Sequence, residues 1–210
     1  EKKIDKTLYS SGPYWDYKNS RAILEIKKKG LSDFRGSSAG IGTSFGDNIP
    51  SDIRNEFNIK GRIISKIFSL PILNKVFNGQ LNLTQDYINY FIKNQAIVYQ
   101  NNKNVENLIN KYHFKNTTEF GCIQIFEKLG IKYSTTYLQM ADRIEKLSKS
   151  FNLENINSFF EIGGGFGANI HFLITNFTNI KKILYLDAVP NIYVGTKYLE
   201  HHFGKKVKNY

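Results

Sequence analysis

The feature that most constrains the fold of this chain is a short apolar segment followed directly by a glycine-rich turn. The apolar segment is Ser158-Phe159-Phe160-Glu161-Ile162, and the turn is Gly163-Gly164-Gly165-Phe166-Gly167. Glycine at this density excludes a regular helix or strand, because it adopts backbone conformations that other residues avoid. The residues that follow, 168–176, have the apolar spacing of a helix. The sequence therefore predicts a strand, a tight turn and a helix.

A second unit follows the first. Residues 182–187 form another apolar run, Lys182-Ile183-Leu184-Tyr185-Leu186-Asp187. Pro190 suits a first helical turn, and Gly204 suits the end of the helix predicted for residues 191–203. Strand, glycine turn, helix, strand and helix in this order are typical of the first part of an open parallel α/β sheet.

Such a turn binds ligands at the carboxyl end of a strand. Bare glycines such as Gly165 let a ligand approach the backbone closely, and the following helix offers free N–H groups to an anionic part of the ligand. Gly167 lets that helix begin close to the strand. Asp187 ends the second strand about 20 residues further on, where a carboxylate can accept hydrogen bonds from the ribose hydroxyls of an adenosine.

Two cofactor classes fit these glycines. Gly163, Gly165 and Ala168 satisfy the G-x-G-x-x-A form of an NAD(P) or flavin dinucleotide site, as in an oxidoreductase or epimerase. Glu161 favours S-adenosylmethionine instead, because a carboxylate there suits the methionine ammonium and repels a pyrophosphate. A dinucleotide site and a purely structural turn remain the alternatives.

The pattern also carries a family resemblance. Phe160-Glu161-Ile162-Gly163-Gly164-Gly165-Phe166-Gly167, followed by Ile183-Leu184-Tyr185-Leu186-Asp187, resembles class I S-adenosylmethionine-dependent methyltransferases. More narrowly, with Tyr198-Leu199 downstream and Ser134-Thr135-Thr136-Tyr137-Leu138 and Phe34-Arg35 upstream, the chain is similar to the bacterial sugar O-methyltransferase family.

The resemblance implies a Rossmann-like fold, S-adenosylmethionine as the cofactor, and O-methylation of a sugar hydroxyl in a bacterial glycan. It places the methionine part of the cofactor against Glu161, Gly163, Gly164, Gly165 and Gly167, and the ribose against Asp187. It identifies no general base. The acceptor is expected to be a small molecule or glycan.

Residues 1–150 are predicted to form a mostly helical region that serves as a lid or an acceptor site, and residues 151–210 a partial cofactor-binding domain. Helices are predicted over 15–29, 51–68, 84–100, 104–112, 117–129 and 135–150. Ser134 is the expected N-cap of the last of these. The Gly/Ser-rich stretch 36–48 is predicted to be a loop, either a lid or a connector.

The helix over 135–150 leads directly into the glycine turn. Its buried face is expected to carry Tyr137, Met140, Ala141, Ile144 and Leu147. Stripes of this kind usually belong to the core, but Tyr137, at the start of the helix, is also a candidate cofactor contact.

Cysteine and histidine usage predicts neither a disulfide nor a metal site. Cys122 is the single cysteine, which favours a reducing, cytoplasmic compartment, and its apolar neighbours predict a buried thiol rather than a nucleophile. Of the histidines, His113 and His171 stand alone, and His201 and His202 are adjacent. Adjacent residues face different directions on a helix, so no metal ligands are predicted.

The net charge is +11, which could attract an anionic partner. Much of the excess is lysine at predicted helix ends, such as Lys27-Lys28-Lys29, where positive charge suits the helix dipole. No nucleic-acid partner is therefore expected; the alternative is attraction of a sugar phosphate or peripheral contact with a glycolipid. No apolar run approaches the roughly 18 residues of a membrane span.

Only two strands of a class I sheet are recognisable, so the chain is expected to be cut at its C-terminus. Two parallel strands alone would leave apolar faces and edges bare. A non-catalytic fragment is therefore a further alternative, and the sequence predicts no oligomeric state.

Overall fold

The computed structural model describes residues 12–36, 104–122 and 125–208. The helices predicted over 51–68 and 84–100, and the Gly/Ser-rich stretch beyond Gly36, lie outside these residues. The described part is a mixed α/β structure with two small sheets. In chain order its elements are α2 (Pro13–Lys29), η1 (Phe34–Gly36), α8 (Asn104–Lys111), β1 (Phe126–Lys128), β2 (Ile131–Tyr133), α9 (Thr135–Ser148), η2 (Leu153–Asn155), β3 (Ser158–Ile162), α10 (Ala168–Asn176), β4 (Lys182–Leu186), α11 (Asn191–Phe203) and η3 (Gly204–Lys206).

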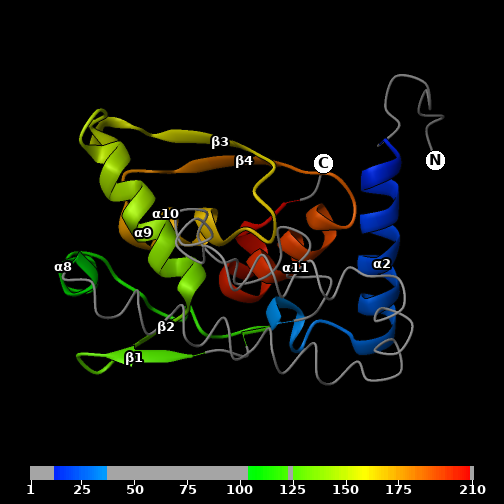
Figure 1. Cartoon of the computed structure of the whole chain (residues 1–210). Helices are drawn as coiled ribbons and strands as arrows, with labels where there is room; N and C mark the ends of the chain where they lie inside the picture. Colours follow the sequence, from blue (N-terminus) through cyan, green and yellow to red (C-terminus); the bar gives the residue numbers. More distant parts are fainter. Residues whose placement is uncertain (1–11, 37–103, 123–124, 209–210) are drawn as a thin grey trace, which may run out of the picture.

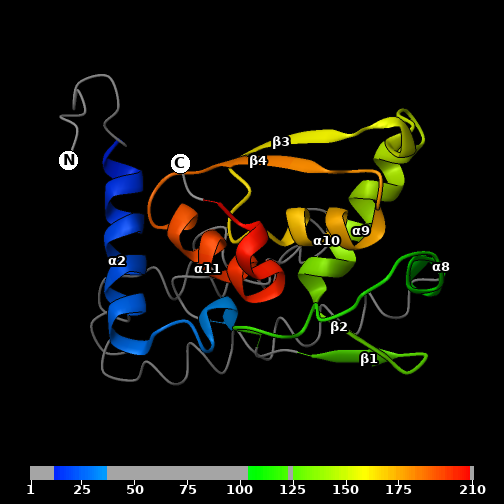
Figure 2. The ribbon, with the colours of Figure 1, turned by 180° about the vertical axis from the view of Figure 1, so that it is seen from behind.

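The predicted strand–helix–strand–helix unit is confirmed. β3 and β4 pair in parallel, with Ser158 opposite Lys182 and Ile162 opposite Leu186. Two views from opposite sides (Figures 1 and 2) show α10 and α11 on the same side of these strands. Ile183 and Tyr185 face the helices and are half-buried, as a period of two along a strand requires.

The other face of the strand pair is apolar and exposed. Phe160 and Ile162 of β3 and Leu184 and Leu186 of β4 each keep more than half of their surface accessible among the described residues. The expectation that two parallel strands leave an apolar face bare is therefore met in this part of the chain. Parallel sheets are normally covered on both faces.

Local signals predicted α2 and α9 well. α2 has Pro13 in its first turn and ends at Gly30, where φ is 71° and the N–H donates to the carbonyl of Ile26. Ser134 is the N-cap of α9, as expected, but its side chain makes no capping hydrogen bond and accepts from Arg35 instead. The helix ends at Ser148 rather than residue 150. Along α9, Tyr137, Ala141 and Ile144 are buried and Met140 is half-buried, whereas Leu147 is exposed, contrary to the prediction.

The helix predicted over 117–129 is wrong. Turns occupy the beginning of this stretch, and β1 and β2 then form an antiparallel hairpin with Lys128 opposite Ile131. The two connecting residues, Leu129 and Gly130, have φ of 55° and 75°. Two consecutive positive φ angles are typical of a type I′ hairpin turn. Gly130, expected to close a helix, closes a hairpin instead.

One hydrophobic core draws on residues both before and after position 150. Phe34 from η1 and Ile109 from α8 are buried in the same cluster as Phe172 of α10 and Tyr198 of α11. Several aromatic rings meet edge to face, as with Phe114 and Phe172, whose centroids are 5.9 Å apart. Cys122 is only half-buried, so the prediction of a buried thiol is wrong.

Gly121 provides a test of this packing. Its φ is +77°, and a Cβ there would lie 2.2 Å from the ring of Phe34. We expect Gly121→Ala to lower the free energy of unfolding by about 2–4 kcal/mol, the sum of left-handed strain and overpacking. Gly130 is a matched control, because its φ is +75° but no atom lies within 4 Å of its Cβ position. Urea unfolding measures both variants, and equal losses would contradict the packing argument.

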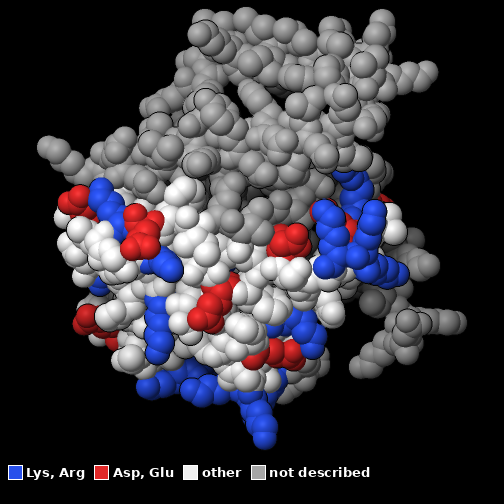
Figure 3. All heavy atoms as spheres, turned by 90° about the horizontal axis from the view of Figure 1, so that it is seen from below, with Lys and Arg blue, Asp and Glu red and all other residues white. Residues whose placement is uncertain are grey.

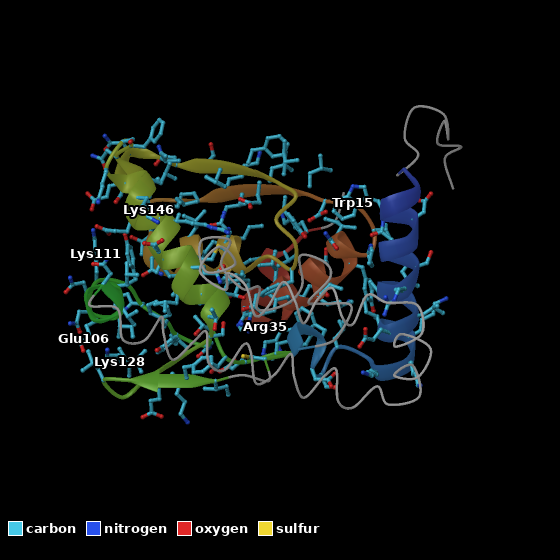
Figure 4. The ribbon with its side chains drawn as sticks, in the orientation of Figure 1. Trp15, Arg35, Glu106, Lys111, Lys128 and Lys146 are labelled. Carbon is cyan, nitrogen blue, oxygen red and sulfur yellow. The ribbon has the colours of Figure 1, made fainter. Side chains whose placement is uncertain are left out.

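Acidic and basic side chains lie near one another on the described surface. On the face shown in Figure 3, acidic side chains lie among the basic ones. Glu106 of α8 lies beside Lys128 of β1 (Figure 4), with 3.0 Å between carboxylate and ammonium. Lys111 pairs with Glu145 of α9 at 2.6 Å. In the part of the chain that the structure describes, no helix is both long and apolar enough to cross a bilayer.

Candidate functional site

The glycine turn joins β3 to α10 through a backbone that only glycine adopts readily. Gly163, Gly165 and Gly167 have φ of 72°, 62° and 88°. The N–H of Gly163 donates to the carbonyl of Leu186 and so continues the β3–β4 ladder by one bond. Gly167 is the N-cap of α10 in the left-handed conformation. A side chain at any of these three positions would strain the turn.

Close contacts explain the glycines at two positions. A Cβ on Gly164 would lie 2.7 Å from Cγ of Glu161, so the absence of a side chain at Gly164 makes room for Glu161. A Cβ on Gly167 would lie 3.1 Å from Leu199, so the absence of a side chain at Gly167 lets α10 pack close to α11. At Gly163 a Cβ would meet no atom within 4 Å in the described structure. The backbone is therefore open to an approaching ligand at Gly163.

Asp187 follows β4 and holds the turn. One carboxylate oxygen accepts a hydrogen bond from the N–H of Gly165 at 2.8 Å. The other accepts from the N–H of Ala188 at 2.7 Å and from the side-chain amide of Asn191 at 3.2 Å. The structure thus brings the predicted Asp187 and Gly165 into direct contact. Each carboxylate oxygen has two lone pairs, so the oxygen that accepts from Gly165 can accept one further hydrogen bond from a ligand, whereas the other oxygen is already fully used.

Glu161 stands at the end of β3 on the other side of the turn. Its carboxylate accepts a hydrogen bond from the side-chain amide of Asn169 at 2.7 Å. The pKa of Glu161 is raised above its ordinary value, mainly because the carboxyl group is buried. The hydrogen bond from Asn169 opposes this rise, and the charge of Asp187 adds to it. Two carboxylates therefore flank the turn at the shared carboxyl edge of the strands.

A pocket of about 480 Å³ adjoins the turn, within the range typical of small-molecule sites. Gln139, Met140 and Arg143 of α9 line it on one side, and Glu161 and the glycines 163–165 on the other. Arg143 is exposed and brings a positive charge to the rim. The pocket thus combines a carboxylate, a guanidinium and open backbone.

Three residues that support the turn were not predicted from the sequence. Asn169 holds Glu161, and the hydroxyl of Tyr185 donates to the carbonyl of Gly165. Phe166 is buried inside the turn, with its ring 5.5 Å from that of Phe34 and 5.0 Å from that of Tyr198. Alternation along β4 could have indicated that Tyr185 faces the helices. Gly195 of α11 leaves the space for its ring, since a Cβ there would lie 2.4 Å from the Tyr185 hydroxyl.

Tyr137, the remaining candidate cofactor contact, lies outside the pocket beside the glycine turn. It is fully buried and is not among the residues that line the pocket. Its hydroxyl is hydrogen-bonded to Nδ1 of His171 and to the hydroxyl of Tyr198, so one polar cluster joins α9, α10 and α11. The structure brings Glu161, Asp187 and the glycines together but does not bring Tyr137 to them.

His171 makes this cluster sensitive to pH. Burial, reinforced by the charges of His202 and Arg35, lowers the pKa of His171 from 6.5 to about 3. Unfolded His171 is protonated below about pH 6.5, whereas folded His171 stays neutral down to about pH 3. Between pH 7.5 and 5.5 this residue should therefore lower the free energy of unfolding by about 1.4 kcal/mol.

Urea unfolding at these two pH values measures the effect. In His171→Gln, whose amide can still meet the Tyr137 hydroxyl, that share of the pH dependence should disappear. His113→Gln, which removes an exposed histidine, should keep it. The same pH dependence in wild type and His171→Gln would contradict the assignment.

Comparisons with protein-family models, with curated proteins and with solved structures found no match to this chain. The ligand class must therefore follow from the groups present. In the described site these are the carboxylates of Glu161 and Asp187, the open backbone at Gly163 and the guanidinium of Arg143.

Proposed function

We propose that this chain binds S-adenosylmethionine at the turn between β3 and α10 and belongs to a methyltransferase. The observation that carries the proposal is the pair of carboxylates, Glu161 and Asp187, on either side of an open glycine turn. An adenosine offers ribose hydroxyls as hydrogen-bond donors, and a methionine moiety offers an ammonium. Both kinds of donor suit carboxylate acceptors.

The groups of the pocket suit the two ends of this cofactor. Glu161 would hold the ammonium, and Arg143 across the pocket would attract the methionine carboxylate. Gly163 would allow close contact with the backbone. Asp187 does not line the pocket but accepts from Gly165, which does, and from there it would bind the ribose. The bound cofactor supplies an electrophilic methyl group on a sulfonium. The protein's own part is to position that methyl group and to hold the backbone of Gly165 in place through Asp187 and Tyr185.

The methyl acceptor is proposed from the resemblance to sugar O-methyltransferases alone, which implies a sugar hydroxyl in a bacterial glycan. A cytoplasmic setting, in keeping with a lone cysteine, is part of the same proposal. The αL glycine at the N-cap of α10 also suits the pyrophosphate of NAD, which keeps a dinucleotide as the rival ligand. Glu161 separates the two ligands, because its negative charge attracts an ammonium and repels a pyrophosphate.

Glu161→Gln tests this separation. The glutamine keeps an oxygen for Asn169 but loses the charge, so we expect affinity for S-adenosylmethionine to fall about tenfold, or about 1.4 kcal/mol. Affinity for NAD should stay undetectable or rise. Equilibrium dialysis with labelled ligands measures both.

Glu154→Gln is the matched control, since Glu154 is an exposed glutamate of η2 outside the pocket. It should bind S-adenosylmethionine like the wild type. If Glu161→Gln and Glu154→Gln both bind as tightly as the wild type, Glu161 does not contact the ligand. If the wild type binds NAD in preference to S-adenosylmethionine, the rival ligand is correct.

A further inference from the structure

A second cluster of ligand-type side chains lies at the far end of α11. Glu119, His201 and His202 each offer a carboxylate oxygen or an imidazole nitrogen, and these atoms lie within 4.8 Å of one another. Nε2 of His201 is 3.6 Å from the Glu119 carboxylate. The cluster shares no residue with the lining of the pocket beside the glycine turn, although α11 itself packs against Gly167 through Leu199.

The segment that carries Glu119 is fixed by the core. The N–H of Glu119 donates to the carbonyl of Asn116, which forms a turn. On one side of it, the buried guanidinium of Arg35 donates to the carbonyl of Thr117 at 2.8 Å. On the other, the ring of Phe120 packs against His201, with 4.9 Å between centroids. These contacts fix the turn at residues 116–120, and the turn places Glu119 beside α11.

The histidines are fixed as well. The ring of His202 stacks on buried His171, with 4.1 Å between centroids and 16° between planes. The rings of His201 and His202 lie 4.9 Å apart and nearly perpendicular. The expectation that adjacent histidines face different directions is therefore wrong here, since both offer a nitrogen to the same cluster. Nε2 of His202 is buried and makes no hydrogen bond within the described residues. Because packing holds His202 in place, little side-chain entropy would be lost on binding a ligand.

The chemistry of this set points to one class of ligand. Two imidazoles and one carboxylate form a donor set that suits Zn²⁺ and similar transition-metal ions, whereas Mg²⁺ and Ca²⁺ prefer all-oxygen sets. The last turn of a helix also favours a cation, since its carbonyl ends carry partial negative charge. Glu119 and His201 are exposed, so an ion and its water ligands could enter from solvent and the two side chains could close around it.

We propose that Glu119, His201 and His202 form a divalent transition-metal site, with Zn²⁺ as its preferred ion, that ties the turn at residues 116–120 to α11. The ion joins two segments that are distant in sequence. Water completes the coordination. The site is independent of the proposed cofactor at the glycine turn.

Calorimetric titration of the full chain with ZnCl₂, after treatment with a chelator, tests the site. We expect one Zn²⁺ per chain and a higher unfolding temperature in its presence, with no comparable response to MgCl₂. His201→Asn and Glu119→Gln should each weaken Zn²⁺ binding at least tenfold. Both positions are exposed, so these variants should fold, which far-ultraviolet circular dichroism checks.

His113→Asn is the matched control, because it removes an exposed histidine outside the cluster and should bind Zn²⁺ like the wild type. The proposal is overturned if the wild type does not bind Zn²⁺, which would leave Glu119 and His201 as a simple ion pair. It is equally overturned if Glu119→Gln and His201→Asn bind as tightly as the wild type.

Discussion

Replacing Asp187 with alanine is expected to weaken S-adenosylmethionine binding at least tenfold, a loss of about 1.4 kcal/mol or more. The substitution removes the acceptor proposed for the ribose and also the partner of the Gly165 N–H. A turn without this hydrogen bond no longer presents Gly163 and Gly165 in a fixed position. Isothermal titration calorimetry measures the affinity, and unchanged affinity would remove Asp187 from the site.

Two causes contribute to that loss, and a second variant separates them. Asp187→Asn keeps an oxygen that can accept from Gly165 but loses the charge and one acceptor. It should keep most of the stability of the turn and bind with an affinity between those of wild type and Asp187→Ala. Asp187→Ala should also lower the free energy of unfolding by about 1–3 kcal/mol, so binding is compared at temperatures where both variants are folded.

The largest effect on stability is expected from Arg35→Ala. Arg35 is buried in the middle of the molecule (Figure 4), where its guanidinium donates to the Thr117 carbonyl and the Ser134 hydroxyl. It also lies over the rings of Phe166 and Tyr137, at 5.1 and 5.6 Å from their centroids. Hydrogen bonds from a charged donor contribute about 1.5–3 kcal/mol each, and truncation would also leave a cavity. We therefore expect a loss of about 3–5 kcal/mol in urea unfolding.

Two controls define what Arg35 contributes. Arg143→Ala, at an exposed position on α9, should change the free energy of unfolding of the ligand-free chain by less than about 0.5 kcal/mol. Arg35→Lys keeps the charge but not the planar fork that reaches two acceptors, and should recover only part of the loss. A change below about 1 kcal/mol in Arg35→Ala would show that the guanidinium does not organise this core.

Elements with local signals were predictable from the sequence. The glycines, Pro190 and the two apolar runs gave the bounds of β3, α10 and α11 as the structure has them, because each signal acts within a few residues. The hairpin at 126–133 was missed because Leu129-Gly130 suits the end of a helix as well as a type I′ turn. Only its packing against the core decides between the two.

Contacts between residues far apart in the chain could not be predicted from local sequence patterns. The carboxylates of Glu161 and Asp187 could be placed on either side of the turn, because parallel strands end at a common edge. Nothing local indicates that Arg35 meets Thr117, or that Glu119 meets His201, since each pair is more than 80 positions apart. Tyr137 illustrates the reverse case, since its position before the turn suggested a ligand contact, yet its hydroxyl is directed to His171 and Tyr198.

A competition titration identifies the ligand of the glycine turn. Tritiated S-adenosylmethionine is crosslinked to the full chain by ultraviolet light in the presence of increasing unlabelled S-adenosylmethionine or NAD. We expect saturable labelling that unlabelled S-adenosylmethionine removes, that NAD leaves intact, and that Asp187→Ala loses. Labelling that NAD displaces, or no saturable labelling of the folded wild type, would show that S-adenosylmethionine is not the ligand of this turn.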